Sequence, residues 1–317
     1  FCNQLFSLET AIYLANISNR KLILLIRNPL AHCGRASWDY GYIMDYFSDD
    51  YKEFLPHGLD VYYGEIPSDI LDIINNEYVT KKQIYKTKFS KLVFVDNNLN
   101  TEKNRNDILN FAKDRTIQNL NFDNNQQYEY FYINQSNASR CFYNFYTTQC
   151  NFNLMNCIAK SLSVLNYNIS TIFNDINLPS EYVAIHFRFG DKKHSASKIK
   201  SNNHLYLSNL DINKLKSLNR EIMIMCDRKD SLILKEFGIL NYRYTDQIID
   251  NIKQKITYTF NNIKDLSVIR FLFEKLICDN SIIFYANEGS TVSNYINYIR
   301  YINNFDYCNL YVNNEDK

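Results

Sequence analysis

Short apolar runs that end in polar residues alternate with stretches of helical spacing in the second half of the sequence. Runs of this length are typical of buried strands, and the stretches between them repeat their apolar residues at helical intervals. Alternation of strand and helix predicts an α/β fold with a parallel sheet. The three runs, each with the polar residue that follows it, are Val183-Ala184-Ile185 before His186, residues 222–226 before Asp227, and residues 282–286 before Asn287.

The first half shows the same alternation less regularly. A helix is expected from Asn3 to Asn19, because its apolar residues recur every three or four positions. Residues 97–146 are rich in Asn, Gln and Tyr and show weak periodicity, so the pattern places no elements there. The other elements expected are strands at Lys21–Ile26, Leu59–Tyr63 and Leu92–Val95, and helices at Phe152–Leu165, at Leu266–Cys278 and from the Asn287 tip to about Ile302.

The polar strand ends of the second half are expected to form one site. Carboxyl ends of parallel strands lie along one edge of a sheet, which is where open α/β sheets bind their ligands. The segment from His186 to Lys200 carries five basic residues, Arg188 among them, against the single acid Asp191. An arginine suits a phosphate because its planar fork gives two parallel hydrogen bonds. The alternative is a structural Arg–Asp pair that closes a turn.

Two expected helix starts carry groups that suit an anion. Ser290, Thr291 and Ser293 open the helix after Asn287, and hydroxyls with free backbone N–H groups at a helix start can hold a phosphate. Asn3 and the following Gln begin the first helix in a similar way. At both places the alternative is an ordinary helix cap, for which Ser, Thr and Asn are strongly favoured.

Composition and charge narrow the class of protein. The 317 residues are enough for two domains, which we place at residues 1–170 and 171–317. A formal net charge of +1 argues against a protein that coats nucleic acid. No C-x-x-C pair and no H-E-x-x-H occurs among the residues, so no metal site is expected. The apolar runs are too short for a membrane span, which takes roughly 20 residues.

The compartment stays open on the sequence alone. The chain begins at Phe1 inside a motif, so a targeting segment could have been trimmed. Four Asn-x-Ser/Thr sequons suit the secretory lumen, but a chain this rich in Asn produces several by chance. Eight cysteines could form disulfides whose pairing the sequence does not give.

Four motifs together resemble the GDP-fucose-dependent fucosyltransferases, in particular the protein O-fucosyltransferase and α1,6-fucosyltransferase group. Their order and spacing match along the whole chain, although each motif is short. A weaker match is Asp45-Tyr46-Phe47, which resembles the acceptor-side aspartate–aromatic stretch of that group. The four motifs are Cys2-Asn3-Gln4 with the helix and strand after it, His186-Phe187-Arg188, Met225-Cys226-Asp227, and Asn287-Glu288-Gly289-Ser290-Thr291-Val292-Ser293.

The resemblance implies a GT-B fold, in which two Rossmann-like domains face each other across a cleft. It implies an inverting, metal-independent transfer of fucose from GDP-fucose to a hydroxyl of a protein or glycan, with no cofactor besides the donor. The carboxyl-terminal domain would bind the nucleotide sugar and the amino-terminal domain would face the acceptor. By position in the motifs, Arg188 and Asn3 would be catalytic, and the donor-binding residues would be His186, Asp227, Asn287, Ser290, Thr291 and Ser293.

The sequence departs from the α1,6 pattern at two positions, and other readings remain. Phe189 stands where that pattern has a second arginine, and Cys226 replaces the usual Thr. The alternatives are an α1,2-type fucosyltransferase, a transferase for another GDP-sugar, and an inactive GDP-sugar-binding module of the same fold. The sequence does not give the acceptor, the linkage or the general base.

Overall fold

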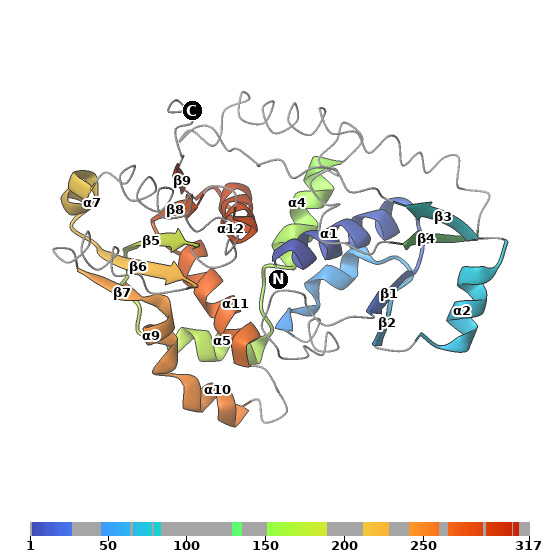
Figure 1. The fold of residues 1–317 in the computed structure, drawn as a ribbon, viewed down its shortest axis with the longest axis horizontal. Helices are drawn as coiled ribbons and strands as arrows, with labels where there is room; N and C mark the ends of the chain where they lie inside the picture. Colours follow the sequence, from blue (N-terminus) through green and yellow to red (C-terminus); the bar gives the residue numbers. More distant parts are fainter. Residues whose placement is uncertain are drawn as a thin grey trace, which may run out of the picture. The chain divides into compact units, whose positions relative to one another are not determined.

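A computed structural model describes most of the expected elements, in two compact units (Figure 1). The first unit comprises Phe1–Leu92 and Arg105–Tyr167, and the second comprises Val93–Asn104 and Asn168–Lys317. The residues described are 2–26, 46–63, 66–77, 79–83, 129–134, 151–188, 212–227, 241–259, 266–287, 290–305 and 307–310.

The first unit contains two pairs of parallel strands among its described residues. Strand β1 (Leu22–Ile26) pairs with β2 (Leu59–Tyr63), and β3 (Val79–Gln83) pairs with β4 (Tyr130–Asn134). The predictions for β1 and β2 are confirmed, whereas β4 lies in the stretch where the sequence placed no element. The predicted strand Leu92–Val95 lies outside the described residues. The other elements described in this unit are α1 (Cys2–Ile17), η3 (Asp49–Phe54), α2 (Ser68–Asn75) and α4 (Phe152–Ser161).

Helix α1 has the buried face that its periodicity predicted, formed by Leu5, Leu8, Ile12 and Ala15. Helix α4 ends at Ser161, earlier than the predicted Leu165. The hydroxyl of Ser161 donates to the Ile158 carbonyl over 2.7 Å, and Leu165 pairs instead with Phe47 in an antiparallel bridge. A hydroxyl that bonds the carbonyl of the preceding turn competes with continued helix, which accounts for the shorter helix.

The second unit is built on a five-stranded parallel sheet with the strand order β7-β6-β5-β8-β9. The chain starts in the middle of the sheet, moves outward to β7, and then returns to the other side of β5 for β8 and β9. A reversal of this kind creates a topological switch point between β5 and β8. The α/β prediction with parallel strands is therefore confirmed. The strands are β5 (Tyr182–Phe187), β6 (Glu221–Cys226), β7 (Tyr242–Tyr244), β8 (Ile283–Asn287) and β9 (Tyr307–Leu310).

Both faces of the central strand β5 are covered, and all six of its residues are buried. Because side chains alternate along a strand, Val183, Ile185 and Phe187 share one face. They pack in a cluster with Leu215 of α7 (Ile212–Leu218). Helices α9 (Thr245–Asp250), α11 (Leu266–Asp279) and α12 (Thr291–Ile302) contact the sheet as well, and the Tyr182 hydroxyl donates to the Ile277 carbonyl of α11 over 2.8 Å. The other helices described in this unit are α5 (Tyr167–Asn174) and α10 (Lys253–Thr259).

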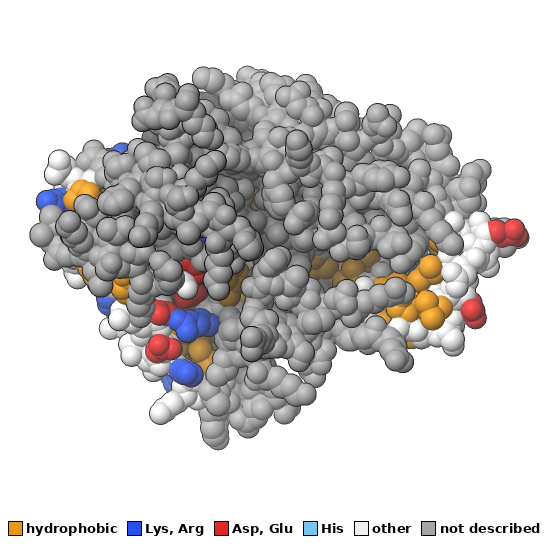
Figure 2. Space-filling model, viewed as in Figure 1, with side chains coloured by type: hydrophobic (Ala, Val, Ile, Leu, Met, Phe, Trp, Pro, Cys, Tyr) orange, Lys and Arg blue, Asp and Glu red, His pale blue; other side chains and the backbone are white. Residues whose placement is uncertain are grey.

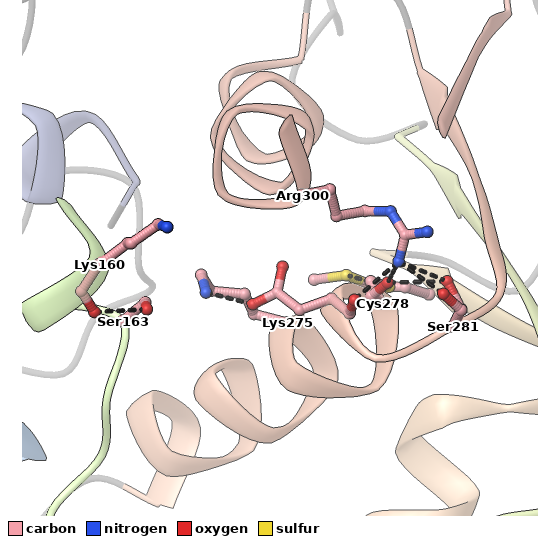
Figure 3. A network of polar contacts seen from close by, with 8 residues as sticks. Lys160, Ser163, Lys275, Cys278, Ser281 and Arg300 are labelled. Carbon is pink, nitrogen blue, oxygen red and sulfur yellow. Dashed lines mark hydrogen bonds and ion pairs between the residues drawn. The ribbon is translucent and has the colours of Figure 1, made fainter. Parts of the chain in front are cut away.

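Arg300 fastens α12 to the end of α11 and to the turn that leads into β8. The side chain is fully buried, and Figure 3 shows its guanidinium directed at this turn. Its Nη1 donates to the carbonyls of Cys278 (3.1 Å), Asp279 (2.7 Å) and Ser281 (2.7 Å). A cation at a helix carboxyl end is favoured by the helix dipole, and these bonds satisfy carbonyls that the helix leaves unpaired.

None of the helices that the structure describes is both long and apolar enough to cross a membrane.

Candidate functional site

The strand ends that the sequence singled out lie next to one another in the sheet. Strands β6, β5 and β8 are neighbours, and the register places His186 opposite Met225 and Phe187 opposite Cys226. Strand β5 extends two residues beyond the predicted end at Ile185, as far as Phe187, so His186 lies within the strand. The carboxyl ends of β5 and β8 flank the switch point, where open α/β sheets bind their ligands.

Ser293 joins the two strands that flank the switch point. Its hydroxyl oxygen lies 2.7 Å from Nδ1 of His186 on β5. The same oxygen accepts the backbone N–H of Asn287, the last residue of β8, over 2.9 Å. All three residues are buried, with Ser293 fully inaccessible to solvent. Three of the predicted donor-binding residues therefore form one hydrogen-bonded group.

His186 is held in its neutral form. Burial lowers the pKa of its imidazole to about 3, and the positive charge of Arg188 lowers this pKa further in the same direction. Burial disfavours a charged imidazole because its hydration is lost, and a neighbouring cation repels the added proton. At neutral pH this side chain therefore carries one ring proton and no charge.

Arg188 is the residue directly after β5 and is partly exposed. Its positive charge lowers the pKa of His186, two residues earlier in the chain. Asp227, which follows β6, is exposed at the same edge. The edge thus carries a cation at β5 and an acid at β6.

Ser290 does not behave as an ordinary helix cap. It occupies the N-cap position of α12, but its side chain makes no capping hydrogen bond. The side chain is only 2% exposed, and its hydroxyl has no hydrogen-bond partner in the described part of the chain. The backbone of Ser290 is fixed by a hydrogen bond, in which its N–H donates to the Asn287 carbonyl over 3.2 Å. Buried hydroxyls are nearly always bonded, so an unpartnered hydroxyl at the start of a helix is unusual.

For the remaining predicted site residues, the structure gives at most the element in which each lies. Thr291 is the first residue of α12, and Asn3 lies in α1 of the first unit. The basic residues from Lys192 to Lys200 lie outside the described residues, as does Asp45 of the acceptor-side stretch.

A second polar group lies beside β6 and was not expected from the sequence. Thr245 of α9 donates from Oγ1 to Glu274 of α11 over 3.3 Å, and Arg270 lies 3.6 Å from the same carboxylate oxygen. Arg270 also pairs with Asp246 at 3.2 Å. Burial raises the pKa of Glu274 to about 7, against the opposing effect of Arg270. The spacing of Arg270 and Glu274 by four residues was the one sequence signal for this group.

Acidic and basic side chains are mixed on the described surface of the second unit. Figure 2 shows Lys or Arg beside Asp or Glu at the left of the view. Lys255 pairs with Asp175 at 2.6 Å, and Arg243 pairs with Glu221. Groups of three metal-ligating His, Cys, Asp or Glu side chains do not occur among the described residues. Cys157 and Cys278 form no disulfide with another described residue.

Solved structures share this fold over nearly the full chain. A crystal structure of POFUT1 in complex with GDP matches with a TM-score of 0.53 at 12% identity, covering 98% of this chain and 95% of that one. The apo form of POFUT1 matches with a TM-score of 0.52 at 12% identity, covering 98% and 94%. Its complex with GDP-fucose matches with a TM-score of 0.50 at 11% identity, covering 98% and 95%.

The sequence itself matches no family model and no curated protein. The sequence identities to POFUT1 are low, so the similarity is one of fold. The resemblance to the GDP-fucose fucosyltransferases is confirmed at the level of the fold: this chain has the fold of POFUT1 over almost its whole length.

Proposed function

We propose that this protein is a fucosyltransferase that moves fucose from GDP-fucose to a hydroxyl of a protein or glycan acceptor. The single observation that carries the proposal is the buried hydroxyl of Ser290, which has no partner among the described residues and lies at the start of α12 beside the switch point. A helix start with a free donor attracts an anion, because backbone N–H groups and the helix dipole point at it. The diphosphate of a GDP-sugar is an anion of this kind.

Arg188 supplies the positive charge that binding of a nucleotide diphosphate requires. In the proposed complex its guanidinium pairs with the phosphate that leaves the sugar, and the start of α12 with Ser290 and Thr291 holds the same diphosphate. As the sugar–phosphate bond breaks, negative charge grows on the leaving group. Donors fixed in advance stabilise that charge more in the transition state than in the ground state. This chemistry gives the protein a route to transfer without a metal ion.

The other edge residues bind the nucleoside part of the donor in this proposal. His186 lies near the end of β5, Asp227 follows the neighbouring strand β6, and Asn287 ends the strand on the other side of β5. The first unit would face the acceptor, with Asn3 beside the fucose–phosphate bond, which is the GT-B arrangement of two domains. Inversion at the sugar carbon follows if the acceptor hydroxyl attacks from the face opposite the diphosphate.

Calorimetric titration with GDP tests the proposal. We expect binding that is equally strong with and without EDTA, since no metal is invoked. A thermal-shift screen of GDP-sugars should then rank GDP-fucose first, and assays of donor hydrolysis should detect release of GDP from it. Absence of GDP binding at millimolar nucleotide would reject the site, and binding without any turnover would favour the inactive module.

A further inference from the structure

Two serines at the start of α12 use their hydroxyls in opposite ways. Ser290 is 2% exposed and its hydroxyl has no partner among the described residues. Ser293 is fully buried, and its hydroxyl is already engaged by His186 and by the Asn287 backbone. The sequence suggested a common phosphate-binding role for both serines, but their surroundings separate them.

The protons of the Ser293 group can be assigned by accounting for its hydrogen bonds. The backbone N–H of Asn287 is a donor, so the Ser293 oxygen accepts there. A serine hydroxyl has one proton to donate, and the other contact of this hydroxyl among the described residues is Nδ1 of His186, at 2.7 Å. If Nδ1 carried the proton of the neutral imidazole, the buried Ser293 O–H would be left with nothing to donate to. An unsatisfied buried donor is costly, so the Ser293 O–H donates to Nδ1.

This assignment fixes the tautomer of the imidazole. With Nδ1 acting as acceptor, the single ring proton of His186 resides on Nε2. The tautomer cannot be lost by protonation near neutral pH, because burial and the nearby Arg188 lower the pKa of His186 to about 3. The backbone of His186 is fixed by the pairing of β5 with β6, in which His186 lies opposite Met225.

We propose that Ser293 is a positioning residue, which holds His186 in the tautomer protonated on Nε2 so that the ring offers an N–H donor to an oxygen of the bound nucleotide sugar. The ligand in this statement rests on the proposed function, whereas the tautomer does not. Ser290, by contrast, is left to contact the anion itself. The two serines of this motif thus have different roles: Ser293 positions His186, and Ser290 contacts the ligand.

NMR of the protein with nitrogen-labelled histidine tests the tautomer without any ligand. The protein has five histidines, and the His186 signals are identified by their loss in His186→Asn. We expect a protonated Nε2 and a bare Nδ1 in the parent protein, unchanged over the neutral pH range. In Ser293→Ala the tautomer protonated on Nδ1 should gain population. A parent protein protonated on Nδ1, or a tautomer unaltered in Ser293→Ala, would overturn the inference; if that variant does not fold, the parent spectrum decides.

Affinity for GDP supplies the second readout. Loss of the oriented N–H donor should weaken GDP binding about fivefold to tenfold in Ser293→Ala, the usual worth of one hydrogen bond. Ser281→Ala is the matched control, since Ser281 is equally buried and bonds a backbone carbonyl at 2.8 Å, and its GDP affinity should equal that of the parent. Equal affinities for all three proteins would refute the positioning role. A parent that keeps the Nε2 tautomer but binds no GDP would instead refute the proposed function.

Discussion

The Ser293 hydroxyl lies 2.7 Å from Nδ1 of His186, although 107 positions separate the two residues in the sequence. The contact joins the end of the central strand β5 to the first turn of α12, which follows β8. Both strands flank the switch point of the sheet, so one hydrogen bond connects the two sides of the candidate donor site.

Replacement of Arg188 should affect turnover far more than binding. Arg188→Lys keeps the positive charge and loses the planar fork, so stabilisation of the leaving diphosphate weakens. We expect GDP-fucose turnover to fall about 10²–10³-fold in Arg188→Ala, the typical loss for one preorganised donor, and GDP affinity to change much less. Steady-state kinetics and calorimetry on the same preparations measure both quantities.

The same measurement separates an enzyme from an inactive binding module. A module would show no turnover in the parent protein and only altered affinity after substitution. Equal turnover of GDP-fucose by the parent and by Arg188→Ala would show that the assigned catalytic role is wrong. Melting temperatures of the parent, Arg188→Lys and Arg188→Ala show whether all three proteins are folded.

Removal of the Ser290 hydroxyl should weaken anion binding without loss of stability. The hydroxyl has no partner among the described residues and makes no capping bond, so Ser290→Ala breaks no contact that the structure describes. A hydrogen bond to a charged group contributes about 1.5–3 kcal/mol, which predicts GDP binding weaker by roughly tenfold or more. Calorimetry measures the affinity, and urea denaturation should give an unchanged free energy of unfolding. A destabilised variant with normal affinity would show that the hydroxyl has a structural partner instead.

Arg300 should be among the side chains on which the second unit most depends. Its Nη1 donates to three backbone carbonyls from a fully buried position. Arg300→Met keeps much of the volume but removes this donor from all three carbonyls, of which that of Cys278 still accepts the Ser281 hydroxyl. We expect the free energy of unfolding to fall by about 3 kcal/mol or more. Arg220→Met is the control, because Arg220 is paired with Glu181 at the surface and such pairs contribute about 0–1 kcal/mol. Urea denaturation of both variants gives the comparison, and equal losses would contradict the role assigned to Arg300.

Glu274 should make the second unit less stable as the pH rises. Burial raises its pKa from the ordinary 4.5 to about 7, so between these values the folded state binds more protons than the unfolded state. The free energy of unfolding therefore falls with pH across this interval. Glu274→Gln has no carboxyl group to titrate at this position. Its free energy of unfolding, relative to that of the parent, should therefore be about 1–3 kcal/mol higher at about pH 8 than at about pH 5.

Denaturation curves at several pH values measure this difference. Glu181→Gln is the control, since Glu181 is about half exposed, and its stability relative to the parent should be nearly the same at each pH. A constant difference between Glu274→Gln and the parent across the range would show that Glu274 does not titrate there.

The sequence determined the elements whose patterns are local. The helix periodicity of residues 3–19 predicted the buried face of α1, and the apolar runs at 183–185 and 222–226 predicted β5 and β6. The polar residue at the end of each run predicted that the site would lie at the carboxyl edge. The predictions of the helix and the two strands were confirmed because hydrophobic periodicity and strand length depend on residues that are near neighbours in the chain. The position of the site stays a prediction.

The sequence could not tell the two serines of the last motif apart. Ser290 and Ser293 are the same residue type, three positions apart, at the start of one helix. Their difference arises from which side of the helix faces β5, and that depends on how α12 packs on the sheet. Arg300 is a similar case, since its partners near the end of α11 are about twenty positions away and belong to another element.

The order of the strands was decided only by the tertiary structure. Alternation of strand and helix along the chain is compatible with several orders of a parallel sheet. The order β7-β6-β5-β8-β9 places the ends of β5 and β8 at a switch point and brings His186 to Ser293. Pairing of strands about one hundred residues apart depends on burial of the sheet against the helices of the unit, which is a property of the whole unit and leaves no local signal in the sequence.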